Sequence, residues 1–300
     1  MTSRAQPTRL ARLCWFLLAL FTVTPSAAAR AQSTPAAEPA PRMPAPAEID
    51  LNVVNLPTTL SLRRHRSYFR LTHRFARDLG RGSFGSLVED LFSLDNGAII
   101  GFEYRFALTG NLHAGAHRSM LSKTIHTFAR YDALRQRAGL PLSMTIGAGV
   151  EGLNNLQDNH QPSISATLSH TRGDVLAVYV TPTFVNKTKA ADFLAGHDDH
   201  DHEHDLGEVD EHAHHDETFF LGFGGRLRIR PTAYIVAEFT PRLYGYDPNQ
   251  HVWAAGIEKY TRGHTLQICF TNSFGTTPGQ LARGGNADQV YLGFNITRKF

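Results

Sequence analysis

Residues 98–106 have the sequence Ala-Ile-Ile-Gly-Phe-Glu-Tyr-Arg-Phe, in which apolar and polar side chains alternate. From Ala98 to Phe106 every even-numbered residue is apolar, while Glu103 and Arg105 fall on the odd-numbered face. This period of two predicts a β-strand with an apolar surrounding on one side and a polar space on the other. Its length of about ten residues is the length with which a tilted strand crosses a bilayer.

The same alternation recurs along most of the remaining chain. The fold class is therefore predicted to be all-β, a closed antiparallel transmembrane β-barrel of about 12 strands, with about 10 or 14 strands as the alternatives. The expected strands are residues 66–76, 97–107, 111–119, 124–135, 142–153, 162–171, 175–186, 218–229, 233–243, 251–261, 264–275 and 289–300.

The connections between these strands alternate in length. Nearly every second one is a tight turn, such as 108–110 or 172–174, whereas others are as long as 187–217 and 276–288; the short connection 120–123 departs from the trend. Outer-membrane barrels have this arrangement, with short periplasmic turns and longer extracellular loops. Alternating faces alone would also fit a soluble two-layer β protein, and the loop pattern favours the barrel.

Residues 1–31 predict a secretory signal peptide. Arg4, Arg9 and Arg12 precede an apolar run, and Ala29-Arg30-Ala31 fits the small-x-small cleavage rule. The apolar run is too short to span a bilayer as a helix. Residues 32–65 are predicted to be a Pro/Ala-rich periplasmic tether that leads into the barrel, and residues 66–300 to be the barrel itself.

Removal of the signal peptide changes the charge of the chain. The whole sequence has 30 Lys+Arg and 27 Asp+Glu, and the first 31 residues contain four of the Arg and none of the acids. The remainder carries 26 basic and 27 acidic side chains, a formal charge of −1, which gives no support to nucleic-acid binding. Only Cys269 remains after residue 31, as expected in an oxidising compartment.

The last ten residues, Tyr291 to Phe300, alternate in polarity and end in Phe. They resemble the terminal strand by which outer-membrane barrels are recognised by the barrel-assembly machinery. Arg298 stands where an apolar residue is more usual in such strands. This ending adds to the evidence for a bacterial outer-membrane location.

A second resemblance lies in the first half of the chain. It is carried by Thr72-His73-Arg74-Phe75, Leu91-Phe92-Ser93-Leu94-Asp95-Asn96-Gly97, Gly101-Phe102-Glu103-Tyr104, Arg118-Ser119 and Lys123-Thr124. With these motifs the chain resembles an uncharacterised family of bacterial outer-membrane β-barrel proteins, a domain of unknown function, over about residues 66–300. The resemblance implies a barrel and a location in the outer membrane. Membrane lipids are the partners expected at that location. It implies no activity and assigns no site residue.

A His- and Asp-rich tract occupies the longest connection. Residues 190–217 contain seven His, eleven Asp or Glu, and no Lys or Arg. Imidazole combined with carboxylate suits Zn, Cu and Ni, and low-complexity His tracts often bind metals. A solvated acidic loop is the alternative, and the His-Glu-x-x-His spacing of zinc proteases is lacking. The predicted metal ligands are His197, His200, His202, His204, His212, His214 and His215.

Two other patterns suggest further hypotheses. His117 and Ser119 share one strand face, and this pair resembles that of outer-membrane phospholipases, so a lipid hydrolase using both residues is the enzyme alternative. Catalysis would require a third group that orients the His, and the neighbouring sequence supplies none. The glycine pattern at 147–152 lies within a strand, which predicts close packing inside the barrel and no dinucleotide site.

Together these features predict a non-enzymatic outer-membrane β-barrel that acts as a narrow solute pore or as a surface scaffold. No cofactor is required for either role, and divalent Zn, Cu or Ni ions are the predicted ligands of the extracellular His-rich loop. A lumen of about twelve strands can be filled largely by its own side chains. Such filling would favour the scaffold over the pore.

Overall fold

The structure, a computed structural model, describes residues 46–91, 94, 97–136, 140–188, 216–246 and 250–300. None of the helices in this part of the chain is long and apolar enough to span a membrane. The strands are β1 (Ser67–Phe75), β2 (Ala98–Ala107), β3 (Leu112–Ser119), β4 (Ile125–Leu134), β5 (Ser143–Gly152), β6 (Asp158–Arg172), β7 (Leu176–Val185), β8 (Thr218–Arg230), β9 (Ala233–Thr240), β10 (Arg242–Gly245), β11 (Val252–Thr261), β12 (His264–Thr271) and β13 (Tyr291–Lys299). The short helices are α2 (Phe84–Glu89), η2 (Leu121–Lys123), α3 (Leu153–Leu156) and α4 (Pro278–Ala282).

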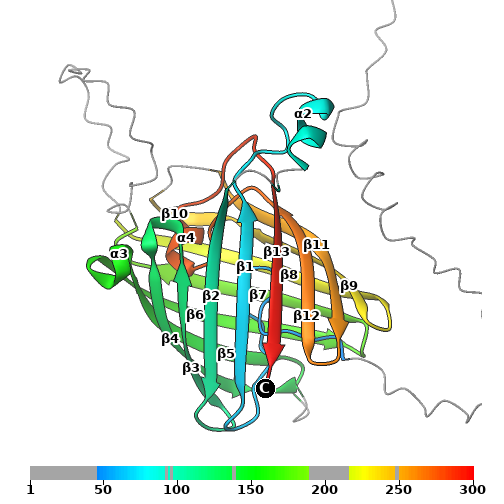
Figure 1. Cartoon of the computed structure of the whole chain (residues 1–300). Coiled ribbons are helices and arrows are strands. Elements are labelled where there is room, and N and C mark those ends of the chain that lie inside the picture. The colour runs from blue at the N-terminus through cyan, green and yellow to red at the C-terminus, as the bar shows by residue number, and fades with distance from the viewer. Residues whose placement is uncertain (1–45, 92–93, 95–96, 137–139, 189–215, 247–249) are drawn as a thin grey trace, which may run out of the picture. The chain divides into compact units, whose positions relative to one another are not determined.

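The strands form one antiparallel sheet that closes on itself (Figure 1). Consecutive strands pair from β1 to β8, β13 pairs with both β1 and β12, and β9 bridges β11 and β8. β10 pairs with the start of β8, so twelve strands form the ring and β10 is the thirteenth strand of the sheet. The predicted closed barrel of twelve strands is therefore confirmed.

Most strand ends agree with the sequence prediction, and three differ for visible reasons. Pro241, which has no N–H to donate, separates β9 from β10 within the predicted strand 233–243. β6 begins at Asp158 because backbone pairing with β5 continues to Gln161 and a further bridge joins Asp158 to Leu153. β12 ends at Thr271 because the chain turns there toward α4.

The two faces of the barrel differ as the alternation predicts. Arg70, Arg74 and Arg226 point into the lumen and are 0–1% exposed, whereas Phe102 and Tyr104 are 46% and 51% exposed on the outer face. In a membrane, lipid would cover the outer apolar side chains, while the polar groups on the inner face need hydrogen-bond partners inside the protein. The inner partners come from two inserted pieces of chain.

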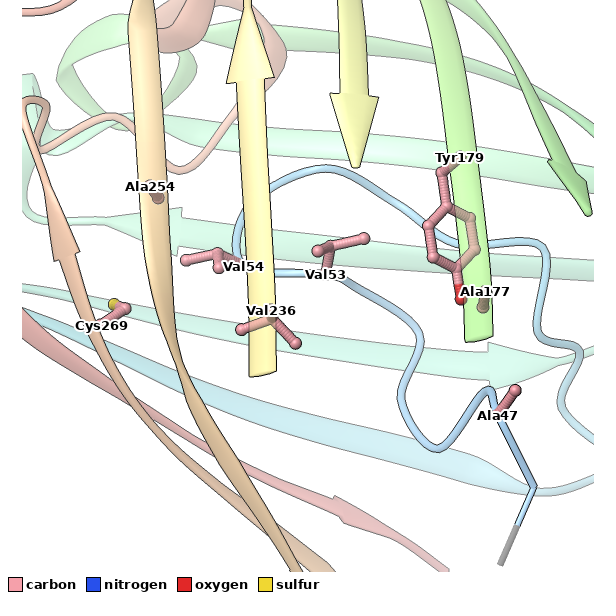
Figure 2. Close-up of a cluster of buried hydrophobic side chains, with 8 residues drawn as sticks. All are labelled: Ala47, Val53, Val54, Ala177, Tyr179, Val236, Ala254 and Cys269. Carbon is pink, nitrogen blue, oxygen red and sulfur yellow. The ribbon is translucent and has the colours of Figure 1, made fainter. Parts of the chain in front are cut away.

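The first insertion is the segment 46–62, which we call the plug. Val53, Val54 and Leu56 are 0–1% exposed, and the backbone N–H of Val53 donates to the Leu56 carbonyl at 2.8 Å, which closes a turn at the tip. Figure 2 shows Val53 and Val54 among the inward-facing side chains of the wall, such as Val236. The structure thus differs from the predicted tether 32–65, because most of residues 47–62 are buried in the barrel instead of extending into solvent.

The plug enters from the end of the barrel that carries the tight turns. The Tyr234 hydroxyl, just after the turn at 231–232, donates to the Pro46 carbonyl at 3.1 Å. On the returning arm, the Ser61 hydroxyl binds Asp132 near the end of β4. If these turns are periplasmic, as the sequence predicts, the plug enters the barrel from the periplasmic side.

The second insertion is α4, which lies in the long connection between β12 and β13 at the opposite end (Figure 1). Its residues Gly279 to Ala282 are all buried. Leu281 and Ala282 belong to the same apolar cluster as Leu56 at the tip of the plug and Phe220 on β8. The two insertions therefore meet inside the lumen.

Candidate functional site in the lumen

One carboxylate receives the tip of the plug. Glu238 on β9 accepts the backbone N–H groups of Val54, Asn55 and Leu56 at 3.1, 2.8 and 3.0 Å. The side-chain amide of Asn55 adds a fourth bond at 2.8 Å. Hydrogen bonds to an ionised acceptor are about twice as strong as neutral ones, and these bonds satisfy N–H groups that no strand pairs.

Basic and amide side chains of the wall bind the oxygen atoms of the plug. The donors come from β1, β2, β4, β8, β12 and β13, so the plug is held from most sides of the ring. The pairs are Arg70 with Val54 O, Arg74 with Asn55 Oδ1 (2.9 Å), Arg105 with Asn52 Oδ1 (2.9 Å), Arg130 with Thr58 O (3.4 Å), Arg226 with Asn52 O (2.8 Å), Gln267 with Val53 O (2.6 Å), Asn295 with Val54 O (3.2 Å) and Lys299 with Ile49 O (2.6 Å).

Two glycines on β8 make room for the apolar side of the plug. A Cβ atom added to Gly222 would lie 2.6 Å from Cδ2 of Leu56, and one added to Gly224 would lie 3.0 Å from Cγ2 of Val53. Both positions face the lumen in the alternation of β8. The wall is therefore shaped to accept this segment at these two points.

α4 is fixed by polar contacts to the wall on the other side of the tip. The backbone N–H of Gly279 donates to Glu151 at 2.9 Å, and the Gln280 side chain donates to the Thr124 hydroxyl at 3.2 Å. Arg283, just after α4, donates to Gln161 at 3.0 Å. The connection that carries α4 is thus bound to the lumen wall.

A cavity of about 70 Å³ remains between the plug, α4 and the wall strands β2 to β8. A site needs about 10–15 Å³ of this kind of volume for each water, so the cavity holds roughly five waters. Its charged or titratable lining residues are Glu103, Arg105, His117, His126 and Arg130. Apolar residues such as Leu56, Phe128 and Leu281 also line this space.

The hydrolase pair His117 and Ser119 lies on the inner face, and each side chain is almost fully buried. Nε2 of His117 lies 3.1 Å from the hydroxyl of Thr276, and its Nδ1 lies 3.5 Å from Glu103. The Ser119 hydroxyl instead accepts the backbone N–H of Leu121 at 3.2 Å. The structure thus joins His117 to Thr276 and points both members of the pair away from the lipid-facing side.

The predicted metal ligands and the glycines of the 147–152 pattern have separate outcomes. His197, His200, His202, His204, His212, His214 and His215 lie outside the described residues. Within the described ranges, no group of three or more His, Cys, Asp or Glu could hold a metal ion. Gly147 and Gly149 lie in β5 and line the lumen cavity, which agrees with the predicted close packing inside the barrel.

Sequence reasoning missed the residues that hold the plug. The polar inner face was predicted, but no partner was assigned to Glu238 or to the arginines. The available signal was the apolar alternation of Ile49, Leu51 and Val53, which continues past the Pro-rich segment.

Several solved structures of porins and outer-membrane proteins are similar to this chain. The KdgM porin has a TM-score of 0.48 and 9% identity, with 78% of this chain and 99% of that chain covered. The COG4313 outer membrane channel from Pseudomonas putida F1 has a TM-score of 0.47 and 12% identity, with 84% and 100% covered. The Acinetobacter baumannii outer membrane protein Omp33 has a TM-score of 0.41 and 10% identity, with 81% and 100% covered.

No curated protein matches the sequence. A family model described as a membrane bound beta barrel domain (DUF5777) matches residues 50–300, a range that includes most of the plug as well as the barrel. The match therefore begins earlier than the resemblance over residues 66–300 suggested. The chain belongs to this family of membrane-bound β-barrel domains, and its location is the bacterial outer membrane.

Proposed function

We propose that the protein is a non-enzymatic barrel whose lumen is closed by its own N-terminal plug. In the closed form it serves as a scaffold for its extracellular loops, and it becomes a narrow solute pore only when the plug withdraws. The observation that carries this proposal is the burial of Val53, Val54 and Leu56 at 0–1% exposure in the centre of the lumen. A solute would have to displace these residues to pass.

A reversible lock on the plug tests the proposal. Because a Cβ at position 224 would lie 3.0 Å from Val53 Cγ2, a double variant Val53→Cys/Gly224→Cys has its thiols within reach of a disulfide. The variant is made in a Cys269→Ser background, because Cys269 is a free buried thiol. We expect planar-bilayer conductance events in the reduced protein and none in the oxidised protein. Equal conductance in the two states would contradict a plugged pore.

A second proposal concerns the connection 187–217. We propose that its seven His side chains bind divalent Zn, Cu or Ni ions and so sequester them at the cell surface. The support comes from the sequence, since seven imidazoles and eleven carboxylates occur within residues 190–217 without a single Lys or Arg. This role would use the plugged barrel as a scaffold and needs no open lumen.

The lipid hydrolase alternative receives no support from the geometry. An acyl-transfer enzyme needs the His to contact the Ser hydroxyl that it activates. His117 contacts Thr276 instead, and the adjoining cavity of about 70 Å³ is too small for an acyl chain. We expect Ser119→Ala to leave lipid turnover in purified outer membranes unchanged, and a loss of hydrolysis would restore the alternative.

A further inference from the structure

The cavity beside the plug has basic and hydroxyl groups on several of its walls. Arg130 and His126 lie on β4, and Asn52 and Asn55 belong to the plug. Small residues on the neighbouring strands β5 and β6 leave the space for this cavity. They are Gly147, Gly149, Ser163 and Ser165.

Arg130 is a buried cation whose hydrogen-bond partners are neutral. Its Nη2 donates to the Thr58 carbonyl at 3.4 Å and to the Thr167 hydroxyl at 3.0 Å, while its Nε has no partner. Asp132 lies two residues along the same strand face, but its carboxylate oxygens accept from Ser61, Thr145 and Arg135. Since buried charges in proteins are normally paired, this guanidinium can still take an anionic partner.

His126 supplies a second open group at the same place. Its side chain is 8% exposed, and Nε2 has no hydrogen-bond partner. Nε2 occupies the space that a side chain at Gly149 would fill, and Gly149 itself lines the cavity. The neighbouring His117, directly opposite in the β3–β4 register, uses its Nε2 on Thr276. His126 is therefore the imidazole that remains available.

Glu103 is the single carboxylate among the described residues that line the cavity. It is already held by Arg70 and Arg105, whose guanidinium groups lie against its two oxygens. The groups left for a ligand are thus the cation Arg130, the imidazole of His126, and hydroxyls such as that of Ser165. This set favours a negatively charged oxygen ligand over a metal cation.

We propose that this cavity binds one small oxyanion, of phosphate or carboxylate size, between the guanidinium of Arg130 and the imidazole of His126. The volume of about 70 Å³ suits an ion of roughly five heavy atoms better than a sugar or citrate. Because Asn52 and Asn55 form part of the lining, the site is complete only while the plug is seated. The inference deepens the proposed function, since such an anion joins the plug to the wall and stabilises the closed form.

The test is the thermal unfolding of the folded full-length barrel in detergent, at constant ionic strength, with sodium phosphate, sulfate, acetate or citrate replacing sodium chloride. A ligand of the folded state raises Tm as its concentration exceeds Kd. We expect phosphate to raise Tm by at least about 3 °C at saturation and citrate to have no effect. An equal response to citrate would show a general salt effect and overturn the site.

Variants separate this site from the rest of the lumen. Arg130→Gln and the cavity-filling Gly149→Val should lose the phosphate response. Arg74→Gln is the matched control, because Arg74 also donates to the plug and has only neutral hydrogen-bond partners, yet it does not line the cavity. It should keep the full response from a lower starting Tm. A phosphate response that persists in Arg130→Gln would overturn the proposal.

Binding of radiolabelled phosphate by equilibrium dialysis covers the case in which Arg130→Gln or Gly149→Val does not fold. The wild type should bind one phosphate per chain, and binding of none would overturn the site. The milder variant Ser165→Ala should weaken this binding several-fold, and unchanged affinity would remove Ser165 from the site. Neither measurement uses conductance, so a failure of the plugged-pore proposal in the disulfide experiment stays distinguishable from a failure of the anion site.

Discussion

Asn55 at the tip of the plug and Glu238 on β9 are joined twice. The backbone N–H and the side-chain amide of Asn55 each donate to the Glu238 carboxylate at 2.8 Å, across 183 residues of sequence. Neither bond belongs to the backbone pairing between neighbouring strands. This pair fixes the depth to which the plug enters the barrel.

Replacement of Glu238 by Gln should loosen the plug while the barrel stays closed. A neutral amide offers one oxygen where the carboxylate offers two, and its NH₂ group would face the N–H donors of the tip. We expect the free energy of unfolding to fall by about 1–3 kcal/mol, measured by urea titration, with faster proteolysis near residues 46–62. Asp174→Asn is the control, because its partly exposed ion pair with Arg228 contributes at most about 1 kcal/mol. Equal losses in both variants would contradict a specific role for Glu238.

The space that Gly222 on β8 leaves for Leu56 can be filled without a change in the sequence of the plug. Gly222→Leu should expel Leu56 from its position, since an added Cβ alone would lie 2.6 Å from that side chain. The expected result is a rise in single-channel conductance in planar bilayers. Gly225→Leu is the matched control, because a Cβ at Gly225 meets nothing within 4 Å. A folded Gly222→Leu barrel with unchanged low conductance would argue that the plug stays in place or that α4 alone closes the lumen.

The C-terminal Phe should matter for assembly more than for secretion. Phe300 donates its backbone N–H to the Ser67 carbonyl at 2.9 Å, next to the β1–β13 pair that closes the ring. Phe300 is 49% exposed, and the centroid of its ring lies 4.9 Å from Cζ of Arg298. Deletion of Phe300 should reduce the folded, heat-modifiable protein in the outer membrane severalfold while export continues. Normal assembly would mean that Phe300 is not needed for recognition by the barrel-assembly machinery.

The His-rich connection should bind several Zn or Cu ions with micromolar-class affinity. Imidazoles with an ordinary pKa of about 6.5 are mostly neutral at pH 7 and able to bind metal, and protons displace the ions near pH 5. Substitution of all seven His by Asn should abolish binding without loss of the folded barrel, as measured by titration calorimetry on both proteins. Equal zinc uptake by the two proteins would leave the tract as a solvated acidic insertion.

The barrel could be predicted because each strand carries its own pattern. In β2 the alternation of Phe102, Glu103, Tyr104 and Arg105 is visible within four residues, and each residue appears on the expected face. The loop lengths then indicate the order in which strands pair. The exception is β9. Its alternation continues past Pro241, but there the strand that pairs with β8 changes from β9 to β10.

The lumen site could not be predicted because its partners are remote in sequence. Residues 48–56 have apolar side chains at intervals, but they follow a Pro/Ala-rich segment that is typical of a tether. Nothing within this stretch indicates that its N–H groups meet Glu238 or that Gly222 leaves space for Leu56. Such pairings depend on the closed ring, which brings together residues far apart in the chain.

The position of the plug also has a consequence for the timing of biogenesis. The tip residues Val53 and Val54 leave the ribosome before every strand of the barrel, yet they bind Glu238, Gln267 and Asn295, which follow 184, 214 and 241 residues later. Contacts of such long range form late in folding. The earliest-synthesised part of the domain is thus among the last to be satisfied, because its apolar side chains lack their lumen contacts until the ring of strands has closed around them.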